Sequence, residues 1–413
     1  MRPVRDGAAR RRLLQAGAGA CVLAAHATLL PAHAAPSMDA PGRCAPWPAW
    51  LAFREQFLRE GARVIDPSSA RAHSVSEAQA YALFFALVAN DRARFEQVLR
   101  WTQDNLAGGD LSLRLPAWLW GRRDDGSYGV IDENSAADAD LWLAYTIGEA
   151  GRLWGERRYL ALSSLLAERI LREESALLPG LGRTLLPGAH GFALAAGRWR
   201  LNPSYAPPFL MRWFATRSRD ARWEELLASS RRLLLESAPR GFAPDWAFYR
   251  ASSAGSAGAE PAAESGNFEG EALPASDRAG SYDAIRVYLW VGLTAPGDPA
   301  REQLLRHLAP MADRTEHDGA PPASIDAVDG SFQGVGPAGF SAALLPFLVA
   351  LDRLSALRAQ ELRLQAHPVP PDAYYEQALQ LFATGWREQR YALAADGSLV
   401  PAWQECSAPP ATR

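Results

Sequence analysis

The chain has 413 residues, of which 48% are hydrophobic and 22% are charged, and its formal net charge is −3 at pH 7. This length suits one large or two ordinary domains, and the hydrophobic content can fill a sizeable core, which excludes a disordered chain apart from its loops. The negative charge argues against nucleic acid as a partner.

An export signal is predicted over residues 1–34. Arg10, Arg11 and Arg12 precede an apolar run over residues 13–30, and small residues follow at the spacing of a cleavage site in residues 32–34. Polar residues interrupt the run, so we expect a cleaved signal and no stable membrane insertion. The mature domain would comprise residues 35–413 and be periplasmic or secreted. Both Sec export and the twin-arginine route fit the pattern.

Processing at this site would change the charge and the cysteine count. It would remove five arginines and one aspartate and lower the formal net charge to about −7. It would also remove Cys21, which does not lie in a lipoprotein site, and leave Cys44 and Cys406 near opposite ends of the chain. In an oxidising compartment a disulfide between them is the simplest interpretation, and two separate buried thiols are the alternative.

Helical spacing of apolar residues dominates the chain. Helices are predicted over residues 48–59, 76–89, 92–106, 138–154, 157–173, 206–217, 220–236, 283–293, 300–312, 340–357 and 372–386. No alternation of strands and helices is visible, which argues against a doubly wound sheet or a β/α barrel. Paired helices with long loops between the pairs favour a single all-α domain, an α/α toroid, and a solenoid of helix pairs fits the pattern nearly as well.

Residues 250–279 differ from their surroundings, because they are rich in Ala, Gly, Ser and Glu and contain few apolar residues. This composition is typical of a flexible segment. A strong helical pattern resumes at Tyr282 and Asp283. We therefore interpret residues 250–279 as an insertion within one domain rather than as a linker between two.

Tryptophan is abundant, with fourteen residues in the chain. Trp118 and Trp246 stand beside proline and other loop residues, where an indole can stack on the flat apolar face of a sugar ring. The alternative is that most tryptophans belong to the core. The loop setting favours ligand contact for Trp118 and Trp246 over the others.

Glu77 is the first candidate for acid catalysis. Residues 76–79 read Ser-Glu-Ala-Gln, which predicts a capping box with Ser76 as the N-cap, so Glu77 would lie in the first turn of a helix. The alternative role is to complement the helix dipole, which lowers a carboxyl pKa. A general acid needs the opposite change, so burial would have to outweigh the dipole.

Further carboxyl groups stand at two other predicted helix starts. Asp138 and Asp140 open one helix, where aspartates commonly serve as caps, and Asp283 opens another. If these helices belong to one toroid, their acids converge at one mouth, as hydrolysis of a glycosidic bond requires. No cofactor or metal is expected, because the histidines are scattered singly and no phosphate-binding or dinucleotide-binding motif is present.

These motifs resemble glycoside hydrolase family 8. Residues 136–154, an Asp-x-Asp followed by an apolar helix that ends in Trp, are similar to the family signature, and the resemblance extends over residues 47–406. The supporting motifs are residues 61–67, 76–79, 116–121, 202–205, 281–286 and 339–343. Their order is similar to that in the periplasmic endo-β-1,4-glucanases, or cellulases, that accompany bacterial cellulose synthases.

The resemblance implies an (α/α)6 toroid that cuts β-1,4-glucan chains internally with inversion and without a metal. Glu77 would be the general acid, Asp283 the base that activates water, and Asp138 the residue that holds and distorts the sugar. Arg286 and Tyr205 would organise the base and its water, and Asp140 would support the helix start. The residues placed along the substrate-binding site are Trp118, Tyr205, Arg286, Trp246, Arg63, Tyr282 and Asp140.

Two departures from the family pattern stand beside the acids. Ala78 replaces the usual glycine after Glu77 and could crowd the cleft, and Ala137 replaces a Ser or Thr whose hydroxyl could bond near Asp138. The expected partners are cellulose chains and a cellulose synthase or export complex. The alternatives are a non-catalytic glucan-binding subunit of that machinery and a related glycosidase acting on xylan, chitosan or mixed-linkage glucan.

Overall fold

The computed structural model describes residues 44–69, 71–252 and 265–406. These residues all belong to one compact unit, Pro41–Arg413. The export signal expected over residues 1–34 lies outside the described residues. Among the helices of the described ranges, none is both long and apolar enough to cross a membrane.

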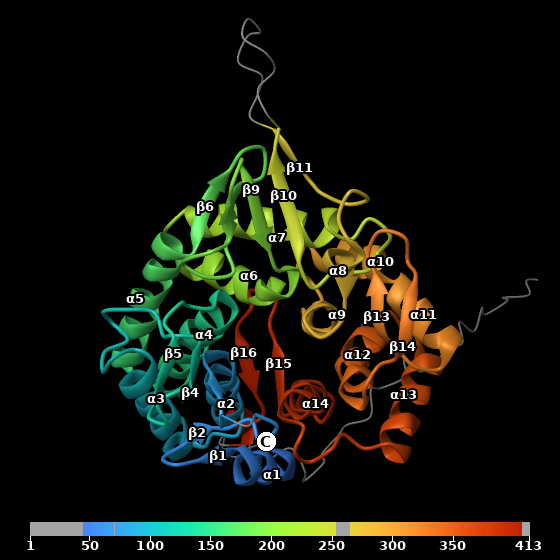
Figure 1. Ribbon diagram of the computed structural model, residues 1–413. Helices are drawn as coiled ribbons and strands as arrows, with labels where there is room; N and C mark the ends of the chain where they lie inside the picture. Colours follow the sequence, from blue (N-terminus) through green and yellow to red (C-terminus); the bar gives the residue numbers. More distant parts are fainter. Residues whose placement is uncertain (1–43, 70, 253–264, 407–413) are drawn as a thin grey trace, which may run out of the picture. The chain divides into compact units, whose positions relative to one another are not determined.

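Helices are the main secondary structure of the described chain (Figure 1). They are α1 (Pro48–Phe57), α2 (Ser76–Val88), α3 (Arg92–Leu106), α4 (Ala137–Trp154), α5 (Arg157–Glu173), η1 (Pro203–Tyr205), α6 (Pro208–Arg217), α7 (Arg222–Glu236), α8 (Ala275–Arg278), α9 (Ala284–Leu293), α10 (Arg301–Leu308), α11 (Pro310–Asp318), α12 (Ala338–Ala350), α13 (Leu354–Ala366), α14 (Tyr374–Arg387) and α15 (Trp403–Cys406).

The longer helices pack in pairs, with one inner and one outer member. The pairs are α2 with α3, α4 with α5, α6 with α7, α9 with α10, α12 with α13 and α14 with α1. Inner helices such as α4 and α9 are buried along most of their length, whereas the outer helix α5 buries one face, through Tyr159, Ser163, Leu166 and Ile170. An apolar stripe at this spacing suits an outer helix, and an apolar surface all round suits an inner one.

A cluster of aromatic rings joins the inner helices at their centre. Phe382 on α14 contacts the rings of Tyr81, Phe84 and Phe85 on α2, and also those of Trp142 on α4 and Trp290 on α9. Centroid separations of 4.7 to 5.3 Å for Phe382 with all five rings lie within the range of favourable aromatic pairs. The main hydrophobic core therefore lies among the inner helices.

Close contact between α9 and α12 depends on Gly292. A Cβ added there would lie 2.3 Å from the backbone nitrogen of Phe347 on α12. No side chain fits at that distance, so the glycine lets two apolar helices approach backbone to backbone.

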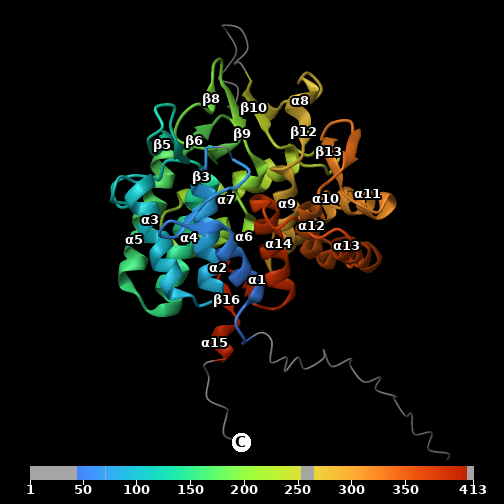
Figure 2. The ribbon, with the colours of Figure 1, turned by 60° about the horizontal axis from the view of Figure 1, so that its bottom comes forward.

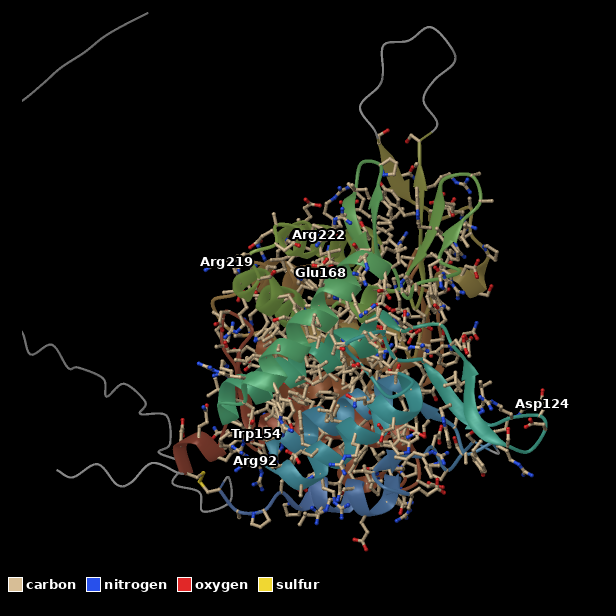
Figure 3. The ribbon with its side chains drawn as sticks, turned by 90° about the vertical axis from the view of Figure 1, so that its left-hand side faces the viewer. Arg92, Asp124, Trp154, Glu168, Arg219 and Arg222 are labelled. Atoms are coloured by element: carbon tan, nitrogen blue, oxygen red, sulfur yellow. A yellow bond between two sulfur atoms is a disulfide. The ribbon has the colours of Figure 1, made fainter. Side chains whose placement is uncertain are left out.

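The outer surface has contacts of another kind, such as the ion pair between Arg222 on α7 and Glu168 on α5 (Figure 3).

Within the described residues, the strands are short and antiparallel and form six small sheets. They are β1 (Leu58–Arg59), β2 (Arg63–Val64), β3 (Ser74–Val75), β4 (Leu119–Arg122), β5 (Tyr128–Asp132), β6 (Ser175–Leu178), β7 (Gly182–Leu185), β8 (Ala193–Leu194), β9 (Arg198–Leu201), β10 (Ala247–Ala251), β11 (Gly266–Phe268), β12 (Ala279–Gly280), β13 (Pro322–Asp326), β14 (Phe332–Val335), β15 (Tyr391–Leu393) and β16 (Leu399–Pro401). Figure 2 shows β3, β5, β8, β9 and β12 at one end of the unit and α15 at the opposite end.

Several sequence-based boundaries were wrong. The helix predicted over residues 300–312 ends at Leu308, and α11 starts at Pro310, which cannot donate a backbone hydrogen bond within a continuous helix. The prediction over residues 340–357 joined two helices, because α12 ends at Ala350 and α13 begins at Leu354. Of residues 250–279, the described parts contribute to β10, β11, α8 and the start of β12, and residues 253–264 lie outside the described residues.

The predicted disulfide is confirmed. Cys44 and Cys406 are bonded, with their Cα atoms 5.7 Å apart, although they are separated by 362 positions in the sequence. Figure 3 shows the bond beside α15. It joins the segment that precedes α1 to the end of the last helix, so the two ends of the described chain are held together.

Candidate active site

Three acidic side chains stand at the starts of three inner helices. Glu77 lies in the first turn of α2, Asp138 lies in the first turn of α4, and Asp283 immediately precedes α9. The strands β3 and β12, which lead into α2 and α9, gather at one end of the unit (Figure 2). The N-cap of α2 is Val75, and no side chain caps it, so the predicted capping box with Ser76 was wrong.

Arg286 connects the three carboxyl groups. Its Nη1 contacts Glu77 and lies 3.1 Å from Asp138 Oδ2, and its Nη2 lies 2.6 Å from Asp283 Oδ1. Nη2 also donates to Ser204 Oγ at 3.0 Å. The arginine side chain is only 2% exposed, so a buried positive charge is surrounded by acids from three helices. This arrangement brings together four of the residues that the sequence motifs had singled out.

Burial decides the protonation of Glu77. Desolvation raises the pKa of Glu77 to about 8, and the opposing attraction of Arg286 is smaller. The negative charges of Asp138 and Asp283 raise it further. Burial therefore outweighs the helix dipole, and Glu77 holds a proton at neutral pH. Burial also raises the pKa of Asp138, against the attraction of Arg286.

Asp283 is held from both sides. Its Oδ1 accepts from Arg286, and its Oδ2 accepts from Asn202 Nδ2 at 3.0 Å. The amide of Asn202 is itself fixed, because its Oδ1 accepts from the backbone nitrogen and the hydroxyl of Ser204. The side chain of Asp283 remains 29% exposed, so water can reach it. A carboxylate with fixed orientation and access to water suits a general base.

Sequence reasoning gave no role to Asn202 or Asp245. Asp245 Oδ1 accepts from the backbone nitrogens of Ser281 and Ala284, both at 2.8 Å, and so satisfies free donors at the start of α9. This contact joins residues that are about forty positions apart in the chain. Only the run of turn-forming residues at 202–205 and the Pro-Asp-Trp at 244–246 could have drawn attention to them.

Three tyrosines surround Arg286. Tyr81 lies with its hydroxyl 3.3 Å from Arg286 Nη1, and the rings of Tyr205 and Tyr375 lie 5.5 and 6.0 Å from the guanidinium carbon. Tyr205 was expected near the base, and the sequence gave no sign of Tyr375. Burial raises the pKa values of all three hydroxyls, so they stay neutral and act as hydrogen-bonding groups.

Aromatic side chains extend from this centre. Trp246 is half-buried, with Phe192 stacked at a centroid distance of 6.1 Å, the Arg200 guanidinium 3.7 Å from its ring centroid, and Tyr205 6.2 Å away. Trp118 is half-buried as well, and its backbone oxygen accepts from the nitrogen of Ser76, next to Glu77. Tyr282 is 54% exposed beside Asp283. These rings offer apolar faces for a sugar chain.

Two residues expected along the substrate lie in the interior. Arg63 is 1% exposed and packs over Trp120, with its Nε donating to Ser74 Oγ at 2.9 Å. Asp140 is fully buried beside Glu174. Arg63 thus supports the strand that leads to Glu77, and Asp140 supports the helix that carries Asp138.

Within the described ranges, no group of three or more His, Cys, Asp and Glu side chains could hold a metal ion. The three acids of the site surround an arginine instead. A protonated carboxyl, a second carboxyl with access to water, and a third acid bound to the same arginine are the groups that acid and base hydrolysis of a glycosidic bond requires.

The model of Glycosyl hydrolases family 8 matches residues 32–389. The chain belongs to this family. It is 46% identical to the endoglucanase of Salmonella typhi over 371 residues, which cover 90% of this chain and 95% of the relative. The endoglucanase of Escherichia coli O157:H7 is 47% identical over 362 residues, with coverage of 87% and 93%. The crystal structure of endo-1,4-D-glucanase from Vibrio fischeri ES114 has a TM-score of 0.76 and 40% identity, and covers 87% of this chain and 99% of its own.

The family resemblance read from the motifs is therefore confirmed, and the protein is a glycoside hydrolase. In this family 8 enzyme, Ala78 and Ala137 are 2% and 0% exposed and belong to the main hydrophobic core. The methyl of Ala78 thus packs into the core instead of projecting toward solvent. The backbone nitrogen of Ala137 donates to Pro187 O at 3.0 Å, which holds the start of α4 without a side-chain hydroxyl.

Proposed function

We propose that the protein is an inverting endo-β-1,4-glucanase that cleaves cellulose chains internally. The observation that carries this proposal is the contact of one buried arginine with Glu77, Asp138 and Asp283. Burial raises the pKa of Glu77 to about 8, which suits a general acid. The curated relatives named above are endoglucanases, which supports a β-glucan as the substrate.

Protonated Glu77 gives its proton to the glycosidic oxygen as the bond to the anomeric carbon breaks. Asp283 removes a proton from a water that attacks the anomeric carbon from the opposite face, so the configuration inverts. Asp138 accepts hydrogen bonds from the sugar at the cleavage point and stabilises its distorted ring. The positive charge of Arg286 offsets the negative charge that Glu77 acquires when it has given up its proton.

Substrate is held on the exposed side of this centre. Tyr282 is exposed beside Asp283, and Trp118 and Trp246 present partly exposed rings. Flat aromatic surfaces at several points along an extended chain favour internal cleavage, because they bind sugar units on both sides of the broken bond.

We further propose that the six helix pairs close into an (α/α)6 toroid. Contacts between successive inner helices support this: α2 packs on α4, α4 on α6, α6 on α9, α9 on α12, and α12 on α14. The ring contacts of Phe382 with Phe84 and Phe85 join α14 back to α2. In such a toroid the helix starts that carry the three acids share one mouth.

The biological setting is also a proposal. An export signal over residues 1–34 and the Cys44–Cys406 disulfide support a periplasmic or secreted enzyme with one catalytic domain over residues 35–413. Such an enzyme would trim the β-1,4-glucan chains that a bacterial cellulose synthase and its export complex produce. Fractionation of cells that express the full chain would test the location, and a purely cytoplasmic product would contradict it.

The activity is tested by release of reducing ends. Purified protein is incubated with carboxymethylcellulose, xylan, chitosan and mixed-linkage β-glucan, with the Asp283→Asn variant as the matched control. We expect fastest release from carboxymethylcellulose together with a rapid fall in viscosity, which marks internal cleavage. Preference for xylan, chitosan or mixed-linkage glucan would correct the substrate, and binding without cleavage would establish a glucan-binding subunit instead.

A further inference from the structure

Two buried carboxyl groups, those of Asp140 and Glu174, lie close together beside the first turn of α4. Asp140 lies two residues after Asp138 in the first turn of α4, and Glu174 directly follows α5. Both are fully buried, and their carboxyl groups lie close enough to form a hydrogen bond once one of them carries a proton. Among the described residues, no arginine forms an ion pair with either of them. The catalytic steps above use neither group.

The hydrogen-bond arrangement requires a proton between these groups. Both oxygens of Asp140 and Oε2 of Glu174 are buried and receive no hydrogen bond from another donor in the described chain. Only Oε1 of Glu174 accepts one, from Ser135 Oγ at 2.5 Å. Two ionised carboxylates with a single hydrogen-bond donor and no cation would be strongly unfavourable in the interior, whereas one proton lets one acid donate to the other.

The pair is also connected to the chain that carries Asp138. Ser135, which is bonded to Glu174, accepts from the backbone nitrogen of Ala189 at 3.1 Å. Asp140 lies on the other side of Asp138, and its carboxyl group faces the same Glu174. The residues before and after Asp138 are therefore both attached to the end of α5, and this attachment limits how Asp138 can move.

We propose that Asp140 and Glu174 share one proton and act as a positioning pair that holds Asp138 for catalysis. The proposal rests on the proposed function, because it assigns Asp138 to the sugar at the cleavage point. Neither residue of the pair touches substrate. Their effect is indirect, through the orientation of the first turn of α4.

Burial and neighbouring negative charges raise the pKa values of the pair and so favour the protonated state. Burial raises the pKa of Glu174 to about 8, and burial together with the charge of Glu174 raises the pKa of Asp140. The other ionisable groups around the pair are Asp138 on α4, Glu173 on α5, and Arg114, Glu133 and His190 in the surface cavity beside Ser135. Because the carboxyls of the unfolded chain ionise near pH 4, the folded protein holds an extra proton from there to about pH 8. The contribution of the pair to stability falls as pH rises through that window.

Asp140→Asn is the decisive variant. The asparagine amide can donate to Glu174 permanently and replaces the shared proton without changing the shape. We expect the infrared carbonyl band of a buried protonated carboxyl to decrease, and the pH dependence of unfolding to lose one proton. We expect kcat near neutral pH to stay within about threefold of wild type, because the geometry is kept.

Asp140→Ala separates positioning from stability. Removing the carboxyl leaves Glu174 without its partner and releases one attachment of the turn, so kcat should fall on the order of tenfold or more while KM changes less. Glu149→Gln is the matched control, because Glu149 is a fully buried acid on the same helix that is ion-paired with Arg152. This control should lower stability without the loss of kcat. If Asp140→Asn keeps the kcat that Asp140→Ala loses, the loss of kcat is due to the missing hydrogen bond to Glu174.

Two results would overturn the proposal. If Asp140→Asn has the same infrared band and the same proton release on unfolding as wild type, no proton is shared. If Asp140→Ala changes kcat no more than Glu149→Gln does, the pair does not position Asp138. Should Asp140→Ala fail to fold, Glu174→Ala serves the same comparison. The infrared and unfolding measurements need no substrate, so a failure of the proposed glucanase function would be recognised separately.

Discussion

Replacing Glu77 by glutamine tests whether this carboxyl is protonated in the folded enzyme. Burial raises its pKa from 4.5 to about 8. Ionising Glu77 in the folded state therefore costs roughly 5 kcal/mol more than in the unfolded chain. The side chain is 18% exposed, so solvent screening reduces this figure little. Glutamine keeps the shape of the protonated acid and cannot ionise.

The sign of the effect follows from the raised pKa. The stabilisation from protonated Glu77 is complete below about pH 4.5 and is lost progressively as the pH rises to about 8, by roughly 1.4 kcal/mol per pH unit. Glu77→Gln should match wild type near about pH 4.5 and exceed it by several kcal/mol at about pH 9. Urea unfolding at a series of pH values measures the difference.

A surface acid provides the control for this comparison. Glu168→Gln changes a half-exposed carboxyl on α5 that faces Arg222 (Figure 3). Its stability should follow wild type at every pH within about 1 kcal/mol. Glu77→Gln should also abolish cleavage while leaving cello-oligosaccharide binding nearly intact, because the amide cannot give a proton to the leaving oxygen. Parallel pH curves for Glu77→Gln and wild type, or turnover by the variant, would refute the reasoning.

Three further outcomes follow from the site and the fold. Asp283→Asn should lower kcat by at least about a thousandfold, since the water loses its base, and reducing-end assays with calorimetric binding of cellohexaose would separate lost turnover from lost binding. A Cys44→Ser, Cys406→Ser double variant should lose stability, with a ceiling of roughly 5–6 kcal/mol for so long a loop, and unchanged denaturation would contradict this. Gly292→Ala should lower the melting temperature by several degrees, because its methyl meets the backbone of Phe347, and a neutral effect would show that α9 and α12 can separate without cost.

Helix positions were largely predictable because their signal is local. The apolar spacing over residues 157–173 matches α5, and the prediction over residues 138–154 misses the start of α4 by one residue. The errors arose where local patterns run together. Apolar spacing continues across Asp352, whose positive φ of 55° marks the turn between α12 and α13. The strands, two to five residues long, are too short for alternation to be visible.

The site was predictable only in part. Acids at helix starts were visible in the sequence, and the family motifs singled out Arg286. Its contact with all three carboxyls depends on tertiary packing, because Arg286 and Glu77 are 209 positions apart in the sequence. Glu174 lies in an Arg-Glu-Glu run that resembles a solvated helix end, yet it is fully buried. No periodicity indicates that its partner is Asp140, because this pairing arises only when α4 and α5 pack together.

The stereochemistry of the first product tests the central claim most directly, because it depends on Glu77 and Asp283 together. An inverting site places a water between base and sugar, whereas in a retaining site the second carboxylate attacks the sugar directly. Proton NMR of the anomeric signals during the first minutes of cello-oligosaccharide hydrolysis should show the α-anomer appearing first and then converting to the equilibrium mixture. A β-anomer as the first product would contradict the assignment of Asp283 as the base that activates water.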